Sequence, residues 1–458
     1  MNTPLTIKET QEGLKNKSFS AVELVDAYLK KINEKNKELN VFLTVTEEEA
    51  YKKAKEIDGS DKSLPLFGAV TAYKDLYLTK GVRTTAASKV LESYVPAYSG
   101  TVVKKLEEAG TIMIGKTNCD AWAHGASGEN SDFGPTKNPW NKEYVPGGSS
   151  SGSAAAVASG MSLIAMGTDT GGSVRQPANF CGLVGLKPTY GAISRYGVIA
   201  MASSLDTIGS FAHTVPDIEI MFNALKGEDG LDASVINFPS PKKKSKYTLG
   251  IAKEFFLKGL DSEVEETVNK AVKVFEKMGI TVKEVSLPHT KYAVPVYYII
   301  QPAEVSSNLG RFDGIRYGNG RETFGDEAKR RIMLGTYVLS AGYYDAFYLK
   351  AQKVRSKLIQ DFDSAFTQVD AIISPVSPTP PFKIGEISSD PLEMYLEDIY
   401  TAGINLTGLP GLAIPFEVSK KGLPIGFQIL GPRFSEEILF DLGNKFHKEI
   451  DYKPSIAY

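Results

Sequence analysis

Apolar side chains recur at helical spacing near the start of the chain and form short strand-like runs after it. Residues 6–57 predict helices, one of which begins with the capping box Ser20-Ala21-Val22-Glu23. Apolar runs at Leu66–Tyr73 and Ile112–Ile114 predict strands, and they alternate with helix-like segments such as Thr101–Glu108. This alternation of strands and helices predicts an α/β protein.

The pattern changes twice in the second half of the chain. Residues 228–246 are polar and rich in proline and lysine, which favours a surface excursion. Tyr247–Ala252 then predicts a strand and Glu263–Lys277 an amphipathic helix, whereas residues 296–360 have a mainly helical pattern. Because we find no internal repeat, we interpret residues 1–458 as a single domain with a helical insertion in its C-terminal half.

Composition and charge argue against several classes of protein. The 458 residues are 42% hydrophobic, which suffices for a large core, and a formal net charge of −2 argues against a polyanion-binding surface. Two cysteines, Cys119 and Cys181, cannot form a disulfide framework, which favours a reduced, cytoplasmic setting. Met1–Lys15 lacks the apolar core of a signal peptide, and we find no apolar run long enough to cross a membrane. We therefore expect a soluble protein.

Two glycine-rich loops carry the candidate chemistry. The first is Gly147–Ser153 and the second is Gly167–Arg175, and each holds serine residues among its glycines. Two such serines are typical of a nucleophile and a proton relay, but a serine hydroxyl does not ionise unaided near neutral pH. The sequence must therefore supply a base.

A third glycine-rich segment resembles a phosphate-binding loop. Gly110–Thr117 matches the Walker A pattern letter by letter. However, its four variable residues, Thr111-Ile112-Met113-Ile114, are β-branched or apolar and prefer a buried strand to a nest of inward-facing amides. We interpret the match as accidental.

The base is better sought among lysines than among histidines. The chain has four histidines, namely His124, His213, His289 and His447. None stands in a recognisable triad context, although a Ser-His-Asp site with scattered members remains an alternative for His124 and His213. We also find no metal-ligand spacing among His, Cys, Asp and Glu.

Lys74 ends the apolar run Leu66–Tyr73, so a sheet would deliver it to the protein interior. Burial disfavours the ammonium form, lowers the lysine pKa and leaves an amine that can accept a serine proton. The alternative is a strand-end lysine that faces solvent or pairs with Asp75.

The set Lys74, Ser149 and Ser173, in this order and in these loops, resembles the amidase signature family. The supporting stretches are Val145–Gly160, Gly167–Gly191 and Gly422–Gln428, and the similarity runs over essentially the whole chain. The resemblance implies a large twisted mixed sheet covered by helices on both faces. It also implies that Ser173 is the nucleophile, that Ser149, held by a cis peptide bond, is the relay, and that Lys74 is the base.

The second loop also has the composition of an oxyanion site. Its glycines allow the chain to turn several amides toward one point, and the amides concerned are those of Thr170, Gly171, Gly172 and Ser173. Asp169 and Arg175 flank the loop, and we expect them to pair and brace it rather than take part in catalysis.

Several further segments resemble one branch of the family, the glutaminase subunits of tRNA-dependent amidotransferases. These segments are Lys116–Asn118, Gly128–Ser131, Phe133–Trp140, Ala328–Thr336, Gly342–Ala346 and Met394–Asp398. The resemblance implies that Arg331 holds the carboxylate and Asp398 the ammonium group of free glutamine, with Tyr298 as a further pocket candidate. The alternative for Arg331 is an ordinary arginine on a helix surface.

The same resemblance implies a function and its partners. The chain would hydrolyse glutamine and pass ammonia to a partner that activates Glu-tRNA(Gln), Asp-tRNA(Asn) or both with ATP and Mg²⁺. The partners would be B and C subunits, with tRNA held mainly by the partner and no membrane involved. This chain itself would need neither metal nor nucleotide. The alternatives are a stand-alone amidohydrolase for another amide and a non-catalytic assembly subunit.

Two segments depart from the usual form of these subunits. The segment from Tyr317 to Phe324 is shorter, and Cys119-Asp120-Ala121-Trp122-Ala123-His124-Gly125-Ala126 stands where Met-Asp-Glu-Phe-Ala-Met-Gly-Ser is commoner. If these residues line the pocket or the ammonia path, substrate handling would differ.

Overall fold

One sheet runs through the molecule. The structure is a computed structural model that describes residues 3–60, 64–239, 243–256, 259–315, 318–387 and 391–457. Within these ranges the strands are β1 (Phe42–Val45), β2 (Val70–Lys74), β3 (Ile112–Thr117), β4 (Ile164–Asp169), β5 (Val184–Lys187), β6 (Thr207–Ala212), β7 (Thr248–Ala252), β8 (Thr281–Val285), β9 (Ala371–Ser374), β10 (Gly411–Val418) and β11 (Pro424–Leu430). They form an 11-stranded sheet in the order β1-β3-β2-β4-β6-β5-β10-β11-β9-β7-β8.

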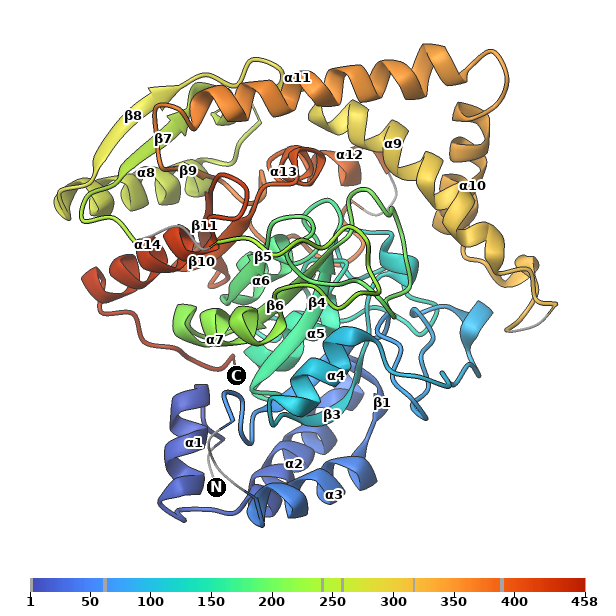
Figure 1. The fold of residues 1–458 in the computed structure, drawn as a ribbon, viewed down its shortest axis with the longest axis vertical. Coiled ribbons are helices and arrows are strands. Elements are labelled where there is room, and N and C mark those ends of the chain that lie inside the picture. The colour runs from blue at the N-terminus through green and yellow to red at the C-terminus, as the bar shows by residue number, and fades with distance from the viewer. Residues whose placement is uncertain are drawn as a thin grey trace.

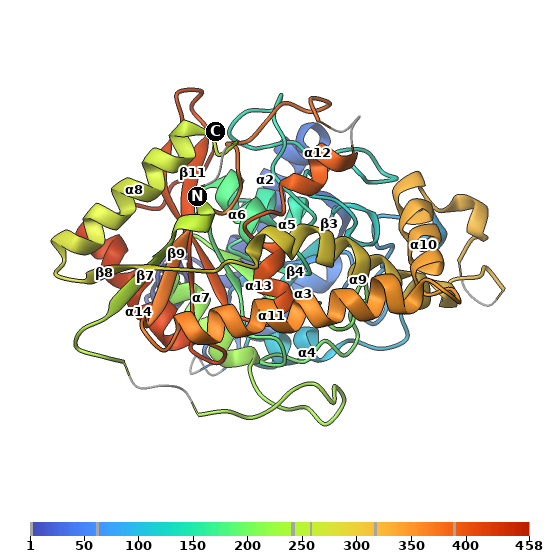
Figure 2. The same cartoon turned by 90° about the horizontal axis from the view of Figure 1, so that it is seen from above.

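Helices cover both faces of this sheet. They are α1 (Ile7–Lys15), α2 (Ala21–Leu39), α3 (Glu47–Asp58), α4 (Thr101–Glu108), α5 (Ser151–Ala158), α6 (Arg175–Cys181), α7 (Val215–Leu225), α8 (Ser262–Lys277), α9 (Ala293–Asn308), α10 (Asp326–Val338), α11 (Lys350–Ala365), α12 (Pro391–Leu396), α13 (Ala402–Thr407) and α14 (Glu436–Glu449). Helices α5 and α6 pack on one face, and α7, α8 and α14 pack on the other (Figures 1 and 2). The sheet mixes parallel pairs such as β2–β4 with antiparallel pairs such as β4–β6, which confirms the predicted fold class.

Two parts of the chain differ from their sequence patterns. Residues 6–57 contain strand β1 between helices α2 and α3, where only helices were predicted. This four-residue strand lies at the sheet edge, antiparallel to β3, and it is too short to show a strand period. Residues 240–242 of the predicted surface excursion and Tyr317 of the shortened segment lie outside the described residues.

The sheet brings the candidate catalytic residues together at the carboxyl ends of its central strands, which we call the active edge and which is distinct from the lateral edge at β1. Strands β2 and β4 are parallel neighbours, so their carboxyl ends, Lys74 and Asp169, lie at the same edge. Helix α5 begins there at Ser151 and helix α6 at Arg175, each directly after a glycine-rich loop. Loops at the carboxyl ends of neighbouring parallel strands are the usual place for a ligand site in such sheets.

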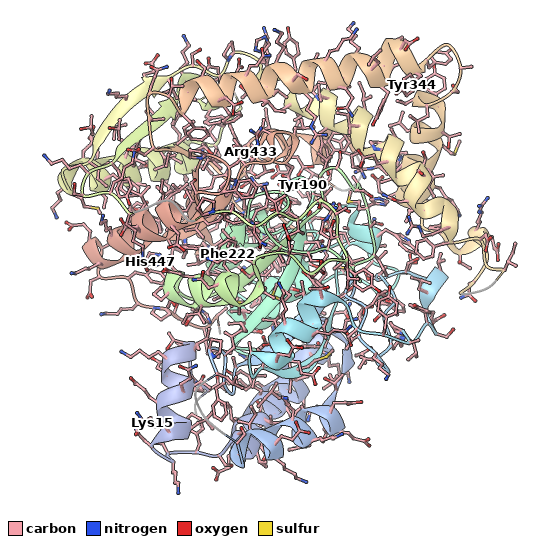
Figure 3. The ribbon with its side chains drawn as sticks, viewed as in Figure 1. Lys15, Tyr190, Phe222, Tyr344, Arg433 and His447 are labelled. Atoms are coloured by element: carbon pink, nitrogen blue, oxygen red, sulfur yellow. The ribbon has the colours of Figure 1, made fainter. Side chains whose placement is uncertain are left out.

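Helices α9, α10 and α11 form an arm above this edge (Figure 1). A π-helical turn, Tyr344–Leu349, leads into α11, and Tyr344 lies at the outer end of the arm (Figure 3). The arm exposes a row of large apolar side chains, which are Met333, Leu334, Tyr337, Leu339, Tyr343, Tyr344, Phe347 and Leu349. None of the helices in the described ranges combines the length and the apolar character that a membrane crossing demands.

Candidate functional site

Lys74 lies at the centre of the candidate site. Its side chain is fully buried at the end of β2, and its Nζ lies 2.7 Å from Ser149 Oγ, 2.9 Å from Thr168 Oγ1 and 3.0 Å from Ser150 Oγ. Burial lowers the pKa of Lys74 to about 8, so the neutral amine becomes accessible close to neutral pH. The solvent-facing alternative is therefore wrong, because this lysine points into a cluster of hydroxyl groups.

The other alternative, a Lys74–Asp75 pair, is also wrong. Asp75 pairs instead with Lys116, whose Nζ lies 3.1 Å from Asp75 Oδ1 and donates to Tyr77 O and Thr84 Oγ1. Lys116 is the lysine of the Walker A look-alike, and it lies in strand β3 rather than in a phosphate loop. The strand that β-branched residues predicted for this segment is thus confirmed.

The first serine loop is fixed to its surroundings by backbone hydrogen bonds. The peptide bond between Gly148 and Ser149 is cis. The Gly148 amide donates to Gln176 Oε1 at 3.0 Å, and the Ser149 carbonyl accepts from the Asp120 amide at 3.1 Å. The Ser150 amide also donates to Ser173 O at 3.2 Å, which joins the two serine loops directly.

Ser173 lies in the second loop, between β4 and α6, and it lines a cavity. The side chains of this loop are buried, but Ser173 keeps 8% of its surface exposed. In the described structure no hydrogen bond joins the hydroxyl groups of Ser149 and Ser173. Of the two contacts that a Lys74–Ser149–Ser173 relay requires, the described structure therefore contains the one between Lys74 and Ser149. Catalytic hydrogen bonds often form fully only when substrate binds.

Asp169 and Arg175 form a fully buried ion pair next to the loop that holds Ser173. Arg175 Nη2 lies 3.0 Å from Asp169 Oδ1, and Arg175 Nε lies 3.1 Å from Oδ2. Burial by itself would raise the pKa of Asp169, but the guanidinium outweighs it and lowers that pKa to about 2. The carboxylate also accepts the amides of Gly172 and Val174, at 2.9 Å and 3.1 Å, and so holds the loop from inside.

The hydrogen bond between Gly172 and Asp169 removes one of the four amides predicted for the oxyanion site. The Gly172 amide donates to Asp169 Oδ1 at 2.9 Å, so it is not free for an oxyanion, and the predicted oxyanion site reduces to the amides of Thr170, Gly171 and Ser173. Glycine is still required at this position, because Gly172 has a φ of +142° and a Cβ would lie 2.4 Å from Thr401 Oγ1. The role of Gly172 is therefore to shape the turn.

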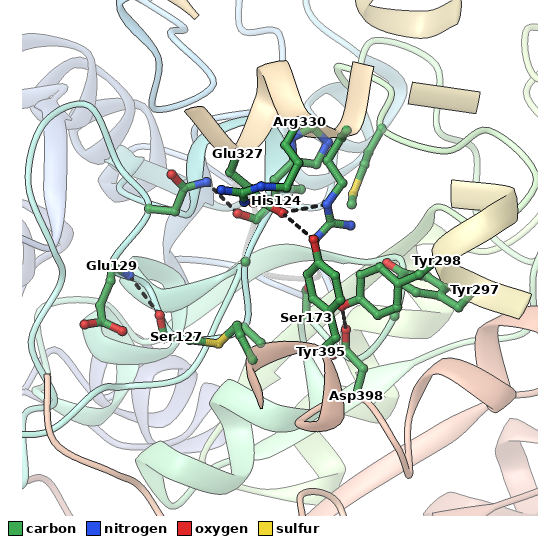
Figure 4. A pocket seen from close by; sticks show the side chains of 18 of the residues that line it. His124, Ser127, Glu129, Ser173, Tyr297, Tyr298, Glu327, Arg330, Tyr395 and Asp398 are labelled. Atoms are coloured by element: carbon green, nitrogen blue, oxygen red, sulfur yellow. Dashed lines mark hydrogen bonds and ion pairs between the residues drawn. The ribbon is translucent and has the colours of Figure 1, made fainter. Parts of the chain in front are cut away.

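The cavity in front of Ser173 has a volume of about 330 Å³. Its wall comes from the loop Ala123–Asn130, from helices α9 and α10 and from the segment Met394–Asp398, as Figure 4 shows. The unusual residues Ala123 to Ala126 thus line the pocket. We therefore expect substrate binding to differ from that in subunits with the commoner sequence.

Arg331 reaches this cavity from helix α10. The side chain is 3% exposed, so it is no helix-surface arginine. Its Nε donates to Glu327 Oε1 and its Nη1 to Gln301 Oε1, both at 2.6 Å. The guanidinium carbon also lies 4.8 Å from the ring centre of Tyr298 and 5.0 Å from that of Tyr395, so aromatic faces help to hold the cation.

Asp398 faces the same cavity with the opposite charge. Its Oδ2 accepts a hydrogen bond of 2.7 Å from the Tyr298 hydroxyl, and Tyr298 stacks on Tyr395 at 3.8 Å between ring centres. Burial raises the pKa of Asp398 to about 7, so a bound cation would favour its charged form. A buried cation and a carboxylate in one pocket suit a small molecule that carries both an anionic and a cationic group.

Several pocket residues escaped the sequence reasoning. Glu327 stands four residues before Arg331, a spacing typical of helical ion pairs that could have revealed it. Tyr395 lies inside Met394–Asp398, a segment that supports the resemblance but predicts no role for this tyrosine. The sequence offers His124 a role only in a scattered Ser-His-Asp site, not in a substrate pocket. Among the four histidines, His124 alone lines the cavity, and His289 instead pairs with Asp361 at 2.9 Å.

The described ranges contain no group of three or more His, Cys, Asp or Glu side chains that could hold a metal ion. Both cysteines are buried and free. Cys119 is close enough to Lys74 to interact with it electrostatically, and burial raises the pKa of its thiol to about 12. A thiol with such a pKa stays protonated and is a poor nucleophile.

Comparison with known proteins identifies the family to which this chain is similar. The model of the family described as "Amidase" matches residues 23–440. The glutamyl-tRNA(Gln) amidotransferase A subunit of Carboxydothermus hydrogenoformans is 49% identical, over 98% of each chain, and that of Koribacter versatilis is 50% identical, over 94% of this chain and 95% of its own. The crystal structure of the glutamyl-tRNA(Gln) amidotransferase A subunit of Thermotoga maritima superposes with a TM-score of 0.83 at 42% identity, covering 97% of this chain and 94% of that one.

Proposed function

This chain belongs to the amidase family, and we propose that it is the glutaminase subunit of a tRNA-dependent amidotransferase. The observation that carries this proposal is that Arg331 and Asp398 line the same cavity as Ser173. A pocket in which Arg331 offers a buried cation and Asp398 a carboxylate fits the two ends of a free amino acid, and the side-chain amide of glutamine would then reach the serine. Near-full-length identity to the A subunits of glutamyl-tRNA(Gln) amidotransferases supports the same function.

Ser173 is the nucleophile of the proposed reaction. Its Oγ attacks the glutamine carboxamide carbon while its proton passes to Ser149 and the Ser149 proton passes to Lys74. The oxyanion is held by the amides of Thr170, Gly171 and Ser173. The proton returns along the same relay to the leaving nitrogen, ammonia departs, and water then hydrolyses the glutamyl ester to glutamate.

The rest of the proposed complex uses the ammonia. Partner subunits of the B and C type bind this chain, hold the tRNA, and use ATP and Mg²⁺ to activate Glu-tRNA(Gln), Asp-tRNA(Asn) or both for amidation in the cytoplasm. The exposed apolar side chains of the arm, among them Met333 and Tyr337, offer one of these partners a surface on the outer side of the pocket. No cofactor is assigned to this chain.

The decisive experiment measures glutamine hydrolysis and Gln-tRNA formation with and without candidate B and C subunits. We expect ammonia release from glutamine and amidated tRNA only when partners and ATP are present. Turnover of a different amide by the lone chain, with no response to partners, would establish the stand-alone amidohydrolase instead. A complex that assembles and leaves glutamine untouched would establish the non-catalytic assembly role.

A further inference from the structure

His124 is held rigidly in the wall of the pocket. Its amide donates to Ala121 O at 3.0 Å, and its carbonyl accepts from Asn130 Nδ2 at 2.6 Å. The two residues before it, Trp122 and Ala123, have φ values of 59° and 65°. Left-handed conformations are unfavourable for residues other than glycine, and strained turns of this kind concentrate at functional sites. The chain thus maintains a strained turn at the point where His124 meets the cavity.

The imidazole of His124 lacks the partners that a buried polar ring needs. The residue is fully buried in the protein wall, and neither Nδ1 nor Nε2 has a hydrogen-bond partner among the described residues. A buried donor or acceptor that stays unpaired destabilises the fold, so such groups are rare unless a ligand or water completes them. Because His124 lines the cavity, the missing partner is best supplied by the molecule that occupies it.

The surroundings of His124 indicate which part of that molecule it meets. Figure 4 places His124 beside α10, whereas Asp398 lies across the cavity beneath the stacked tyrosines. Burial and the nearby charge of Arg331 lower the pKa of His124 well below its usual range, so the ring is neutral and carries one N–H donor. A neutral donor near a guanidinium suits an anionic group, and the ammonium end of an amino acid is served by Asp398.

We propose that His124 is a specificity-determining residue that donates one N–H to the α-carboxylate of the amide donor, alongside Arg331. This inference rests on the proposed function, since it takes glutamine as the donor. An amide without a carboxylate would leave the imidazole unpaired in a buried wall. His124 therefore adds selectivity for amino-acid amides over simple amides.

The test uses the assembled complex and compares His124→Leu, His124→Gln and His124→Asn with the unaltered protein. Hydrogen bonds to charged groups contribute about 1.5–3 kcal/mol, so His124→Leu should raise the KM for glutamine by about ten- to a hundredfold while kcat changes by less than about threefold. Asn and Gln carry an amide donor near the positions of the two ring nitrogens, so one of them should recover most of the loss. The inhibition constant of 4-aminobutanamide, which is glutamine without its α-carboxylate, should change by less than about twofold in all three variants.

Three results would overturn the inference. These are an unchanged KM in His124→Leu, an equal loss for glutamine and 4-aminobutanamide, and a fall confined to kcat. Failure of the unaltered complex to hydrolyse glutamine would instead count against the proposed function, so the two failures are distinguishable. His213→Leu is the matched control: it also removes a buried imidazole, but His213 does not line the cavity, and we expect its KM to stay unchanged.

Discussion

The floor and the wall of the cavity are built in different ways. At the floor, Ser173 lines the cavity, whereas Lys74 and Ser149 are fully buried at the same end of the sheet. Lys74 Nζ contacts Ser149 Oγ, and the Ser150 amide donates to Ser173 O.

The wall consists of the loop Ala123–Asn130, helices α9 and α10 and the segment Met394–Asp398. Helix α10 carries Arg331 inward and exposes Met333 outward, with 72% of its surface accessible. The proposed chemistry thus lies at the ends of sheet strands, whereas the proposed recognition groups lie on a loop and on helices, of which α10 also faces the outside.

This difference has a consequence that kinetics can detect. Changes in the floor should lower kcat, because these groups act on bonds that change in the transition state. Changes in the inner wall should raise KM, and changes on the outer side of α10 should alter only the response to partners. The size of the effect should fall from the floor to the inner wall and from there to the outer side of the helix.

Replacing the nucleophile should have the largest effect. Ser173→Ala should lower kcat for glutamine hydrolysis by at least about 10⁴-fold, because loss of a catalytic nucleophile leaves only binding and oxyanion stabilisation. Ammonia release in steady state measures the effect, and an unchanged melting temperature shows that the fold is intact. The matched control is Ser151→Ala, which should retain measurable turnover because Ser151 is buried in the same region but bonds Thr136. Comparable losses in both variants would contradict the assignment.

Removing the base should come second and should change the pH profile. Lys74→Met should lower kcat by about 10²–10⁴-fold, the range of general acid–base catalysis. In the unaltered protein the rate should rise with pH and level off above about pH 8, because the amine accepts a proton only when it is neutral and the pKa of Lys74 is about 8. The residual activity of Lys74→Met should lack this rise. If the rate of Lys74→Met still rose with pH at the same midpoint, the ionising group would be a residue other than Lys74.

Changing the inner wall should affect binding. Arg331→Gln should raise the KM for glutamine by about tenfold to a hundredfold with a smaller change in kcat, since it removes a charge-assisted hydrogen bond. Lys329→Gln alters a nearby cation on the same helix, and we expect it to leave KM unchanged; Lys329 donates to Glu322 O outside the pocket wall. Titration of initial rates against glutamine gives both constants. If both substitutions raised KM equally, Arg331 would contribute only through its charge and not through a direct contact with glutamine.

The outer side of α10 should have the smallest effect on the lone chain. Met333→Glu should change the free energy of unfolding by less than about 0.5 kcal/mol, as expected for an exposed position, while weakening association with a partner. Size-exclusion chromatography of mixed subunits and a chemical denaturation curve test the two halves of the prediction. Undisturbed assembly would show that the partner contacts another surface.

The residues of the floor could be predicted from the sequence more completely than those of the wall. Lys74 could be singled out because a lysine at the end of an apolar strand is unusual, and the resemblance then supplied Ser149 and Ser173. The direction of the Gly172 amide could not be predicted, because it depends on a carboxylate three residues earlier that turns back into the loop. His124 reaches the pocket only through the left-handed turn before it, which no propensity favours.

Similar reasons explain the remaining differences in the fold. Strand β1 has four residues, and its burial depends on pairing with β3 at the sheet edge. Helix α13 spans only six residues, Ala402–Thr407, and all six are buried by tertiary packing. Short elements of this kind are determined by contacts that are distant in sequence rather than by local periodicity.

The buried pair next to the Ser173 loop also predicts when this chain can first become active during its synthesis. Arg175 donates to Thr401 O, Asn405 Oδ1 and Gln428 Oε1, at 3.2 Å, 2.7 Å and 3.0 Å, and Asn405 in turn donates to Asp169. A nascent chain that has emerged only as far as residue 400 holds the lysine and both serines, yet it lacks every one of these acceptors. Because contacts between distant parts of a chain form late, a ribosome-bound or truncated chain should not consume glutamine before its last strand is in place.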